Sequence, residues 1–181
     1  MRLRTRTIQI AFGLLLLAAL LLLVGLVLPR HQTVVRRIVT TATPAQWFPQ
    51  LATLQRWPEW TAWNTNRFPD LTMRFEGPDT GEGATLIAAG KSSGDGTVKI
   101  TSADPAAGLT YTLDFQHGAQ LFNGAIRFTN AADGWLVTWT LDADLGRNPV
   151  KRWAGLALGA LMGGDMEKGL ANLKRELETS R

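Results

Sequence analysis

Residues 109–115 read LTYTLDF and residues 135–142 read WLVTWTLD, and apolar and polar side chains alternate along both segments. A side-chain period of two is typical of a β-strand with one dry face and one face in water. The dry faces carry Leu109, Tyr111, Leu113 and Phe115 in the first segment and Trp135, Val137, Trp139 and Leu141 in the second. Because these side chains must leave water, the pattern predicts a sheet with a helix packed on one face.

Five more segments have the composition of strands. Together with the two above, the expected strands are Thr33–Thr40, Leu71–Glu76, Gly83–Ala89, Thr97–Ala103, Leu109–Gln116, Leu121–Thr129 and Trp135–Asp142. The last six are joined by short stretches rich in Gly, Asp and Asn, which suit hairpins and are too short for parallel crossovers. Two short helices are expected after the first strand, beginning near Thr43 and Pro44 and ending near Trp57. The sequence therefore predicts an α+β fold built on an antiparallel meander.

The segment Pro149–Thr179 is the candidate for the covering helix. In its second half, apolar residues recur at helical spacing at Met166, Leu170, Leu173 and Leu177. Its first half, Ala154–Gly164, is apolar on all sides and too short to cross a bilayer, so we expect it to be buried against the dry face of the sheet. Gly155, Gly159 and Gly163 are four residues apart and would share one side of the helix. Such a stripe either permits close approach of helix to sheet or leaves room for a ligand.

An uncharged apolar stretch, IQIAFGLLLLAALLLLVGLVL, occupies Ile8–Leu28 near the N-terminus. As a helix at about 1.5 Å per residue it would be about 31 Å long, which is enough to cross the hydrocarbon core of a membrane. The alternative is a cleaved secretory signal, but the apolar run is longer than such signals have and ends in Leu26–Pro29 without a small-residue cleavage site. We therefore expect an uncleaved anchor in residues 1–29, followed by one domain in residues 30–181.

Arginines flank this anchor on both sides. Arg2, Arg4 and Arg6 precede it, and Arg30, Arg36 and Arg37 follow it. With the α-amino group included, the count favours an N-terminus in the cytoplasm. The expected protein crosses a membrane once, which we take to be a bacterial inner membrane, and its main domain faces the outer, periplasmic side.

The composition of the 181 residues excludes several classes of function. The chain has no Cys and only two His, which leaves no thiolate ligand, disulfide or cysteine nucleophile and little for a metal site, so no metal or cofactor is expected. The 19 basic residues outnumber the 15 acidic ones, but three of the arginines precede the anchor. Without them, 16 basic residues (19 less 3) face 15 acidic ones, so the domain lacks the basic surface that a nucleic-acid partner requires.

Four segments of the sequence carry a resemblance to a known family. They are RWPEWTAWN at Arg56–Asn64, GPDTGEGA at Gly77–Ala84, WLVTWTLDADLG at Trp135–Gly146 and MEKGLANLKREL at Met166–Leu177. In this order, with the meander and the terminal helix, they resemble the START-like, polyketide cyclase/dehydrase and lipid-transport superfamily (SRPBCC proteins), and in particular members with an N-terminal membrane helix. The resemblance implies a helix-grip (START/Bet v 1-like) fold, in which the sheet wraps around the C-terminal helix and encloses a cavity for apolar molecules such as lipids, sterols or polyketides. It carries no catalytic residues across.

The candidate ligand-binding residues are aromatic side chains and one glycine. They are Trp57, Trp60, Trp63, Tyr111, Phe115, Trp139, Trp153 and Gly159. Large rings stack on flat ligands, but they also fill cores, and both interpretations are open for the tryptophans. The residues that could supply acid–base chemistry are Glu59, His117 and Tyr111.

Three functions are compatible with these patterns. The first is a membrane-anchored binding module for a hydrophobic small molecule or lipid, held between sheet and terminal helix. The second is an enzyme of the polyketide cyclase or aromatase type, which would need two titratable groups in one pocket. The third is a ligand-free protein-interaction module, which would have a filled core.

Overall fold

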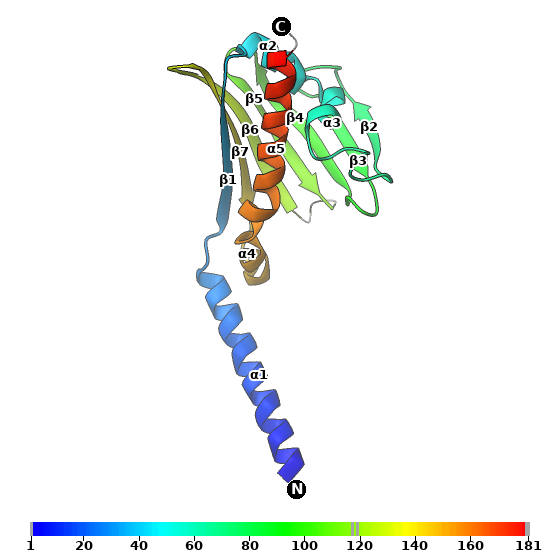
Figure 1. The fold of residues 1–181 in the computed structure, drawn as a ribbon. Helices are drawn as coiled ribbons and strands as arrows, with labels where there is room; N and C mark the ends of the chain where they lie inside the picture. Colours follow the sequence, from blue (N-terminus) through cyan, green and yellow to red (C-terminus); the bar gives the residue numbers. More distant parts are fainter. Residues whose placement is uncertain (1, 117, 119, 180–181) are drawn as a thin grey trace.

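The computed structural model describes residues 2–116, 118 and 120–179, and in this part of the chain seven strands form one antiparallel sheet (Figure 1). The strands are β1 (His31–Thr40), β2 (Thr72–Glu76), β3 (Thr85–Ala89), β4 (Gly96–Asp104), β5 (Gly108–Phe115), β6 (Gln120–Ala131) and β7 (Gly134–Asp144). Their order in the sheet is β1-β7-β6-β5-β4-β3-β2. Strands β2 to β7 therefore form the predicted meander, and β1 joins it beside the last strand.

The pairing of β1 with β7 is fully antiparallel and begins where the N-terminal helix ends. His31 lies opposite Asp144, and Thr40 lies opposite Trp135. The other edge of the sheet is β2, which is short and largely exposed. The first residue of β1 and the last residue of β7 thus lie side by side at the same end of the sheet.

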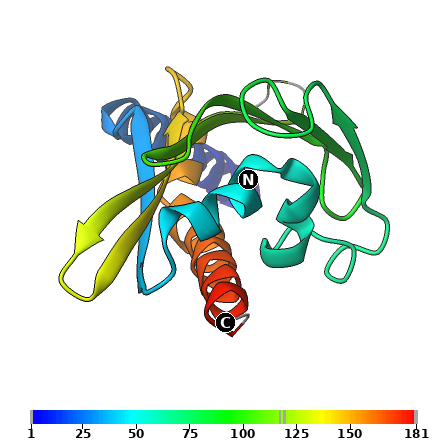
Figure 2. The ribbon, with the colours of Figure 1, turned by 90° about the horizontal axis from the view of Figure 1, so that it is seen from above.

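Two short helices follow β1, as predicted. Helix α2 (Pro44–Ala52) begins with a capping box, in which the Thr43 N–H donates to the side-chain oxygen of Gln46 at 2.9 Å. After a single 3₁₀ turn, η1 (Leu54–Arg56), helix α3 occupies Trp57–Trp60. These pieces place the tryptophan-rich segment against the concave face of the sheet (Figure 2).

Helix α5 (Leu158–Thr179) runs through the concave side of the sheet, which curves around it (Figure 2). The predicted face of this helix is confirmed, because Met166, Leu170 and Leu173 are buried and Leu177 is partly buried in the core. The dry faces of β5 and β7 supply most of the opposing surface. The core residues of these two strands are Leu109, Tyr111, Leu113, Val137, Trp139, Leu141 and Ala143.

The expected single C-terminal helix is wrong in its first half. The chain forms a separate helix α4 (Pro149–Gly155), which ends before α5 begins at Leu158. Most of residues 154–161 are exposed: Gly155 is buried and Leu158 packs partly against the core, but Leu156 and Leu161 are 53% and 67% exposed. The physical reason is position: β1 begins at His31 and β7 ends at Asp144, and helix α4 lies beyond this end of the strands (Figure 1).

The glycine stripe is accordingly divided between two helices. Gly155 ends α4, and an added Cβ there would overlap the side chain of Leu145. An added Cβ at Gly163 would overlap the guanidinium of Arg36, whereas one at Gly159 would meet no atom within 4 Å. Close approach therefore explains two of the three glycines.

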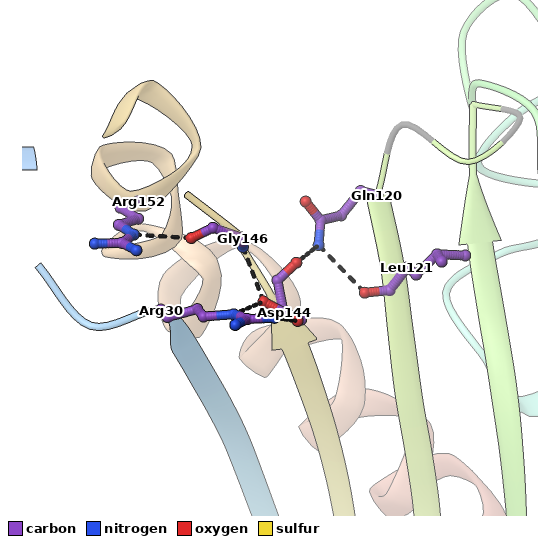
Figure 3. Close-up of polar contacts among 6 residues, drawn as sticks. All are labelled: Arg30, Gln120, Leu121, Asp144, Gly146 and Arg152. Atoms are coloured by element: carbon purple, nitrogen blue, oxygen red, sulfur yellow. Dashed lines mark hydrogen bonds and ion pairs between the residues drawn. The ribbon is translucent and has the colours of Figure 1, made fainter. Parts of the chain in front are cut away.

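Helix α1 (Arg2–Val27) extends away from the sheet (Figure 1) and is long and apolar enough to cross a membrane between Gln9 and Val27. A polar cluster fixes the chain just after it (Figure 3). Arg30 donates from Nε and Nη2 to the two carboxylate oxygens of Asp144, at 2.9 and 2.7 Å, and the Gly146 N–H donates to the same carboxylate at 2.8 Å. These donors hold the pKa of Asp144 well below its usual range. The carboxylate therefore ties the start of β1 to the end of β7.

Candidate functional site

An apolar pocket of about 190 Å³ lies between the concave face of the sheet, the segment after α3 and the first half of α5. Its wall is formed by Trp57, Thr61, Ala62, Trp63, Phe68, Ser93, Val98, Tyr111, Leu113, Phe115, Trp139, Leu141, Met162, Asp165 and Met166. The strand residues come from the dry face that the alternating pattern predicts. Ligand pockets for drug-sized molecules are usually about 300–1,000 Å³, so this space suits a small molecule or part of an elongated apolar one.

Tyr111 and Trp139 form a buried, hydrogen-bonded pair in the pocket wall. The indole Nε1 of Trp139 donates to the Tyr111 hydroxyl oxygen at 2.8 Å, and both side chains are buried. Burial raises the pKa of Tyr111 far above its ordinary value, so the hydroxyl keeps its proton. A hydroxyl that accepts from an indole can still donate its own hydrogen. The pair can therefore offer one donor to an oxygen atom of an otherwise apolar ligand.

Aromatic rings surround this pair at contact distance. The ring of Trp57 meets Tyr111 edge-on at 5.2 Å between centroids, and Trp60 meets Trp139 at 5.5 Å. The Trp57 Nε1 donates to the carbonyl of Leu51 at 2.8 Å, which fixes the indole while its ring faces the pocket. Such edge-to-face pairs have preferred geometries and hold the wall in shape.

Asp165, a residue of the pocket wall, forms an ion pair with Arg67. Arg67 Nη1 lies 2.7 Å from Asp165 Oδ2, and this contact links the segment after α3 to helix α5. Both side chains are partly exposed, at 50% and 34%, so the pair lies where the pocket meets solvent. An exposed pair of this kind contributes little to stability, roughly 0–1 kcal/mol, and can open at small cost.

The pocket lies towards the end of the sheet from which α1 leaves. Phe115, at the end of β5, lines the pocket and pairs with Gln120. Gln120 in turn donates from Nε2 to the carbonyl oxygens of Leu121 and Asp144 (Figure 3). The aromatic wall and the junction with α1 therefore share one end of the sheet.

The structure brings five of the eight predicted ligand-binding residues together in this pocket. They are Trp57, Trp63, Tyr111, Phe115 and Trp139. Trp60 is buried in the core behind the wall, whereas Trp153 in α4 and Gly159 at the start of α5 are exposed and do not line the pocket. Of the two interpretations of the tryptophans, the structure supports core packing for Trp60.

The predicted acid–base residues do not meet in this pocket within the described residues. Glu59 is exposed on the far side of α3, in a separate open cleft with Asn172, Arg175 and Glu176. His117 lies outside the described residues. Tyr111 is in the wall, where the second titratable residue is Asp165.

Several wall residues were not among the candidates from sequence. Leu113 and Leu141 lie on the dry face and follow from the same alternation that identified Tyr111 and Trp139. Met162 is one helical turn before Met166, a residue already assigned to the buried face, so helical spacing could have identified it. Phe68 and Ser93 come from irregular segments, and no sequence pattern marks them.

The fold and the pocket define a helix-grip protein, in which a curved antiparallel sheet and a long C-terminal helix surround an apolar space. A family model described as polyketide cyclase/dehydrase and lipid transport matches residues 31–178. The chain therefore belongs to this family, and the resemblance stated from the sequence is confirmed. No curated protein matches the chain.

Solved structures show the same fold at low sequence identity. An uncharacterized protein from Rhizobium leguminosarum has 18% identity and a TM-score of 0.59, over 82% of this chain and 95% of that one. The di-domain ARO/CYC StfQ of the steffimycin biosynthetic pathway has 12% identity and a TM-score of 0.60, over 83% of this chain and 51% of that one. Ara h 8.0201 has 14% identity and a TM-score of 0.57, over 82% and 99%. At these identities the likeness concerns the fold.

Proposed function

We propose that this protein is a membrane-anchored binding module for a hydrophobic small molecule or lipid. The observation that carries the proposal is the open apolar pocket, whose aromatic wall holds a single hydrogen-bonded Tyr111–Trp139 pair. Apolar lining with few polar groups is the usual character of a small-molecule site. The family description, which includes lipid transport as well as polyketide cyclases and dehydrases, supports a hydrophobic ligand.

In this proposal residues 8–28 cross the membrane once, and residues 30–181 form the binding domain. The N-terminus lies in the cytoplasm and the domain on the outer face, which we take to be the periplasmic face of a bacterial inner membrane. Because the chain has no Cys, a single Ala132→Cys substitution in the exposed β6–β7 turn reports on which side of the membrane the domain lies. A membrane-impermeant maleimide should label it in cells with a permeabilised outer membrane, and labelling only after lysis would reverse the orientation.

Native mass spectrometry of the full chain released from detergent tests the ligand. We expect an apolar adduct on the wild type that is lost in Ala62→Phe, because Ala62 lines the pocket and a ring added there would fill space a ligand needs. Ala132→Phe is the matched control, since Ala132 is exposed in a turn away from the pocket. No adduct on the wild type, or equal adducts on all three chains, would contradict the proposal.

A further inference from the structure

An exposed apolar surface extends along α4 and the start of α5. Its large side chains are Val150, Trp153, Leu156 and Leu161, which are 64%, 38%, 53% and 67% exposed. Ala154, Ala157, Gly159 and Ala160 are exposed as well, whereas Gly155 is buried and Leu158 packs partly against the core. We call residues 149–161 the elbow, because α4 ends and α5 begins within it.

The elbow is fixed to the last two turns of α1. Gly25 is buried against α4, where an added Cβ would lie 2.7 Å from the Cβ of Pro149. Trp153 Nε1 donates to the carbonyl of Leu21 at 2.9 Å. Arg152 Nη1 donates to the carbonyl of Leu26 at 2.5 Å and lies 3.2 Å from that of Leu28. The carbonyls of Leu26 and Leu28 lie at the C-terminal end of α1, where backbone carbonyls lack helical partners and a cation is favourable.

These contacts set the depth of the elbow relative to the apolar helix. Leu21 is six residues before Val27, where the membrane-length stretch ends, and this corresponds to about 9 Å along a helix. A side chain bonded at Leu21 therefore lies alongside α1 within that stretch. At this depth the indole ring has apolar surroundings, and its N–H is satisfied by the Leu21 carbonyl, as a buried tryptophan requires.

The charges around the elbow suit the surface of a membrane. Residues 145–164 contain Arg147, Lys151 and Arg152 and no acidic residue. Arg152 also donates from Nε to the carbonyl of Gly146 at 2.9 Å, so one cation joins the elbow to the end of β7 (Figure 3). A helix with apolar residues on one side and Lys or Arg beside them is typical of segments that lie in the interface of a bilayer.

We propose that the elbow inserts into the bilayer that α1 crosses, with Val150, Trp153, Leu156 and Leu161 among the lipid acyl chains next to α1. This rests on the proposed membrane anchor. The next residue, Met162, lines the pocket, so the inserted segment continues directly into the pocket wall. An apolar ligand could then pass between the bilayer and the pocket along a surface that stays out of water.

Depth-dependent fluorescence quenching on the full chain tests this inference. The cysteine-free sequence allows one labelled cysteine at a time, at Leu156 or Leu161 in the elbow, at Leu15 in α1, and at Ala132 in the β6–β7 turn. Each NBD-labelled chain is reconstituted in vesicles of equal parts phosphatidylcholine and phosphatidylglycerol. Quenching is compared between doxyl groups on the acyl chains and iodide in the water.

We expect doxyl lipids to quench the two elbow labels and the Leu15 label severalfold more than the Ala132 label, and iodide to give the reverse order. Two elbow positions are used so that one poorly folding variant does not decide the result. If Leu15 is quenched by doxyl lipids but both elbow labels respond only to iodide, the insertion is refuted and the anchor stands. If the elbow labels are protected from both quenchers, another protein surface covers them, and the insertion is again refuted. If Leu15 is not quenched by doxyl lipids, the anchor and the insertion both fail.

Discussion

Replacing Gly163 by alanine is expected to destabilise the protein relative to the same replacement at the neighbouring Gly164. An alanine Cβ at position 163 would overlap the guanidinium of Arg36, whereas one at position 164 would meet no atom within 4 Å. The guanidinium lies between β1 and α5, where its Nε is 2.6 Å from a carboxylate oxygen of Glu167. Its Nη2 donates to the carbonyl of Gly159 at 3.2 Å. The substitution therefore displaces the Arg36 side chain, which links β1 to α5 through these two contacts.

The size of the effect follows from the contacts that Arg36 loses. Each alanine gains about 1 kcal/mol of helix propensity, and this gain cancels when the two variants are compared. The ion pair is partly exposed, at 28% and 63%, and such pairs contribute roughly 0.2–1 kcal/mol. The bond to the carbonyl contributes about 0.5–1.5 kcal/mol. We expect Gly163→Ala to be less stable than Gly164→Ala by about 1–2 kcal/mol, or about 2–8 °C in Tm for a protein of this size.

Thermal unfolding of the full chain in detergent, followed by circular dichroism, measures this difference. The penalty should largely disappear when both alanines are compared in an Arg36→Ala background, because the side chain that clashes is then absent. Equal melting temperatures for the two single variants would refute the reasoning. So would a penalty of the same size in the Arg36→Ala background.

Three other predictions concern the pocket and the junction with α1. Tyr111→Phe leaves the buried N–H of Trp139 without its acceptor and should lower stability by about 1–3 kcal/mol; an unchanged melting temperature would contradict it. Gly25→Leu collides with the first residue of α4, so amide hydrogen exchange should become faster in α4 and stay unchanged in the second half of α5; unchanged exchange in α4 would count against the packing described. Arg30 lowers the pKa of Asp144, so the ionised Asp144 carboxylate stabilises the fold at pH values above the ordinary carboxyl pKa of about 4. This contribution is lost progressively as the pH falls from about 4 towards the lowered pKa of the folded state. The wild type should therefore lose more stability than Asp144→Asn between pH 6 and pH 3, and parallel pH profiles would exclude this role.

The sheet and the strand residues of the pocket wall could be predicted from the sequence because alternation reports directly which side chains leave water. Tyr111, Phe115 and Trp139 were identified in this way, and the structure places them in one pocket. The burial of segment 154–161 against the sheet was predicted wrongly for a related reason. An apolar stretch shows that its side chains avoid water, but not which apolar surroundings receive them. The break between α4 and α5 could not be located either, because it follows Gly155, whereas α5 continues unbroken through Gly159 and Gly163.

Phe68 and Ser93 were beyond prediction because their positions depend on contacts that no local pattern marks. Phe68, for example, donates its backbone N–H to the carbonyl of Asn64 at 3.0 Å, in a segment that the ion pair of Arg67 with Asp165 links to a distant helix. Glu59 was a candidate because apolar residues flank it in sequence, but a short helix turns it away from the rings that precede and follow it.

The pairing of β1 with β7 has a consequence for the order of events during biosynthesis. His31 leaves the ribosome early, but its partner Asp144 is synthesised only after almost the entire sheet. The first strand therefore has no partner on this side until β7 has been synthesised. Contacts between residues so far apart in sequence slow folding. Completion of the sheet is thus expected to be a late step in folding.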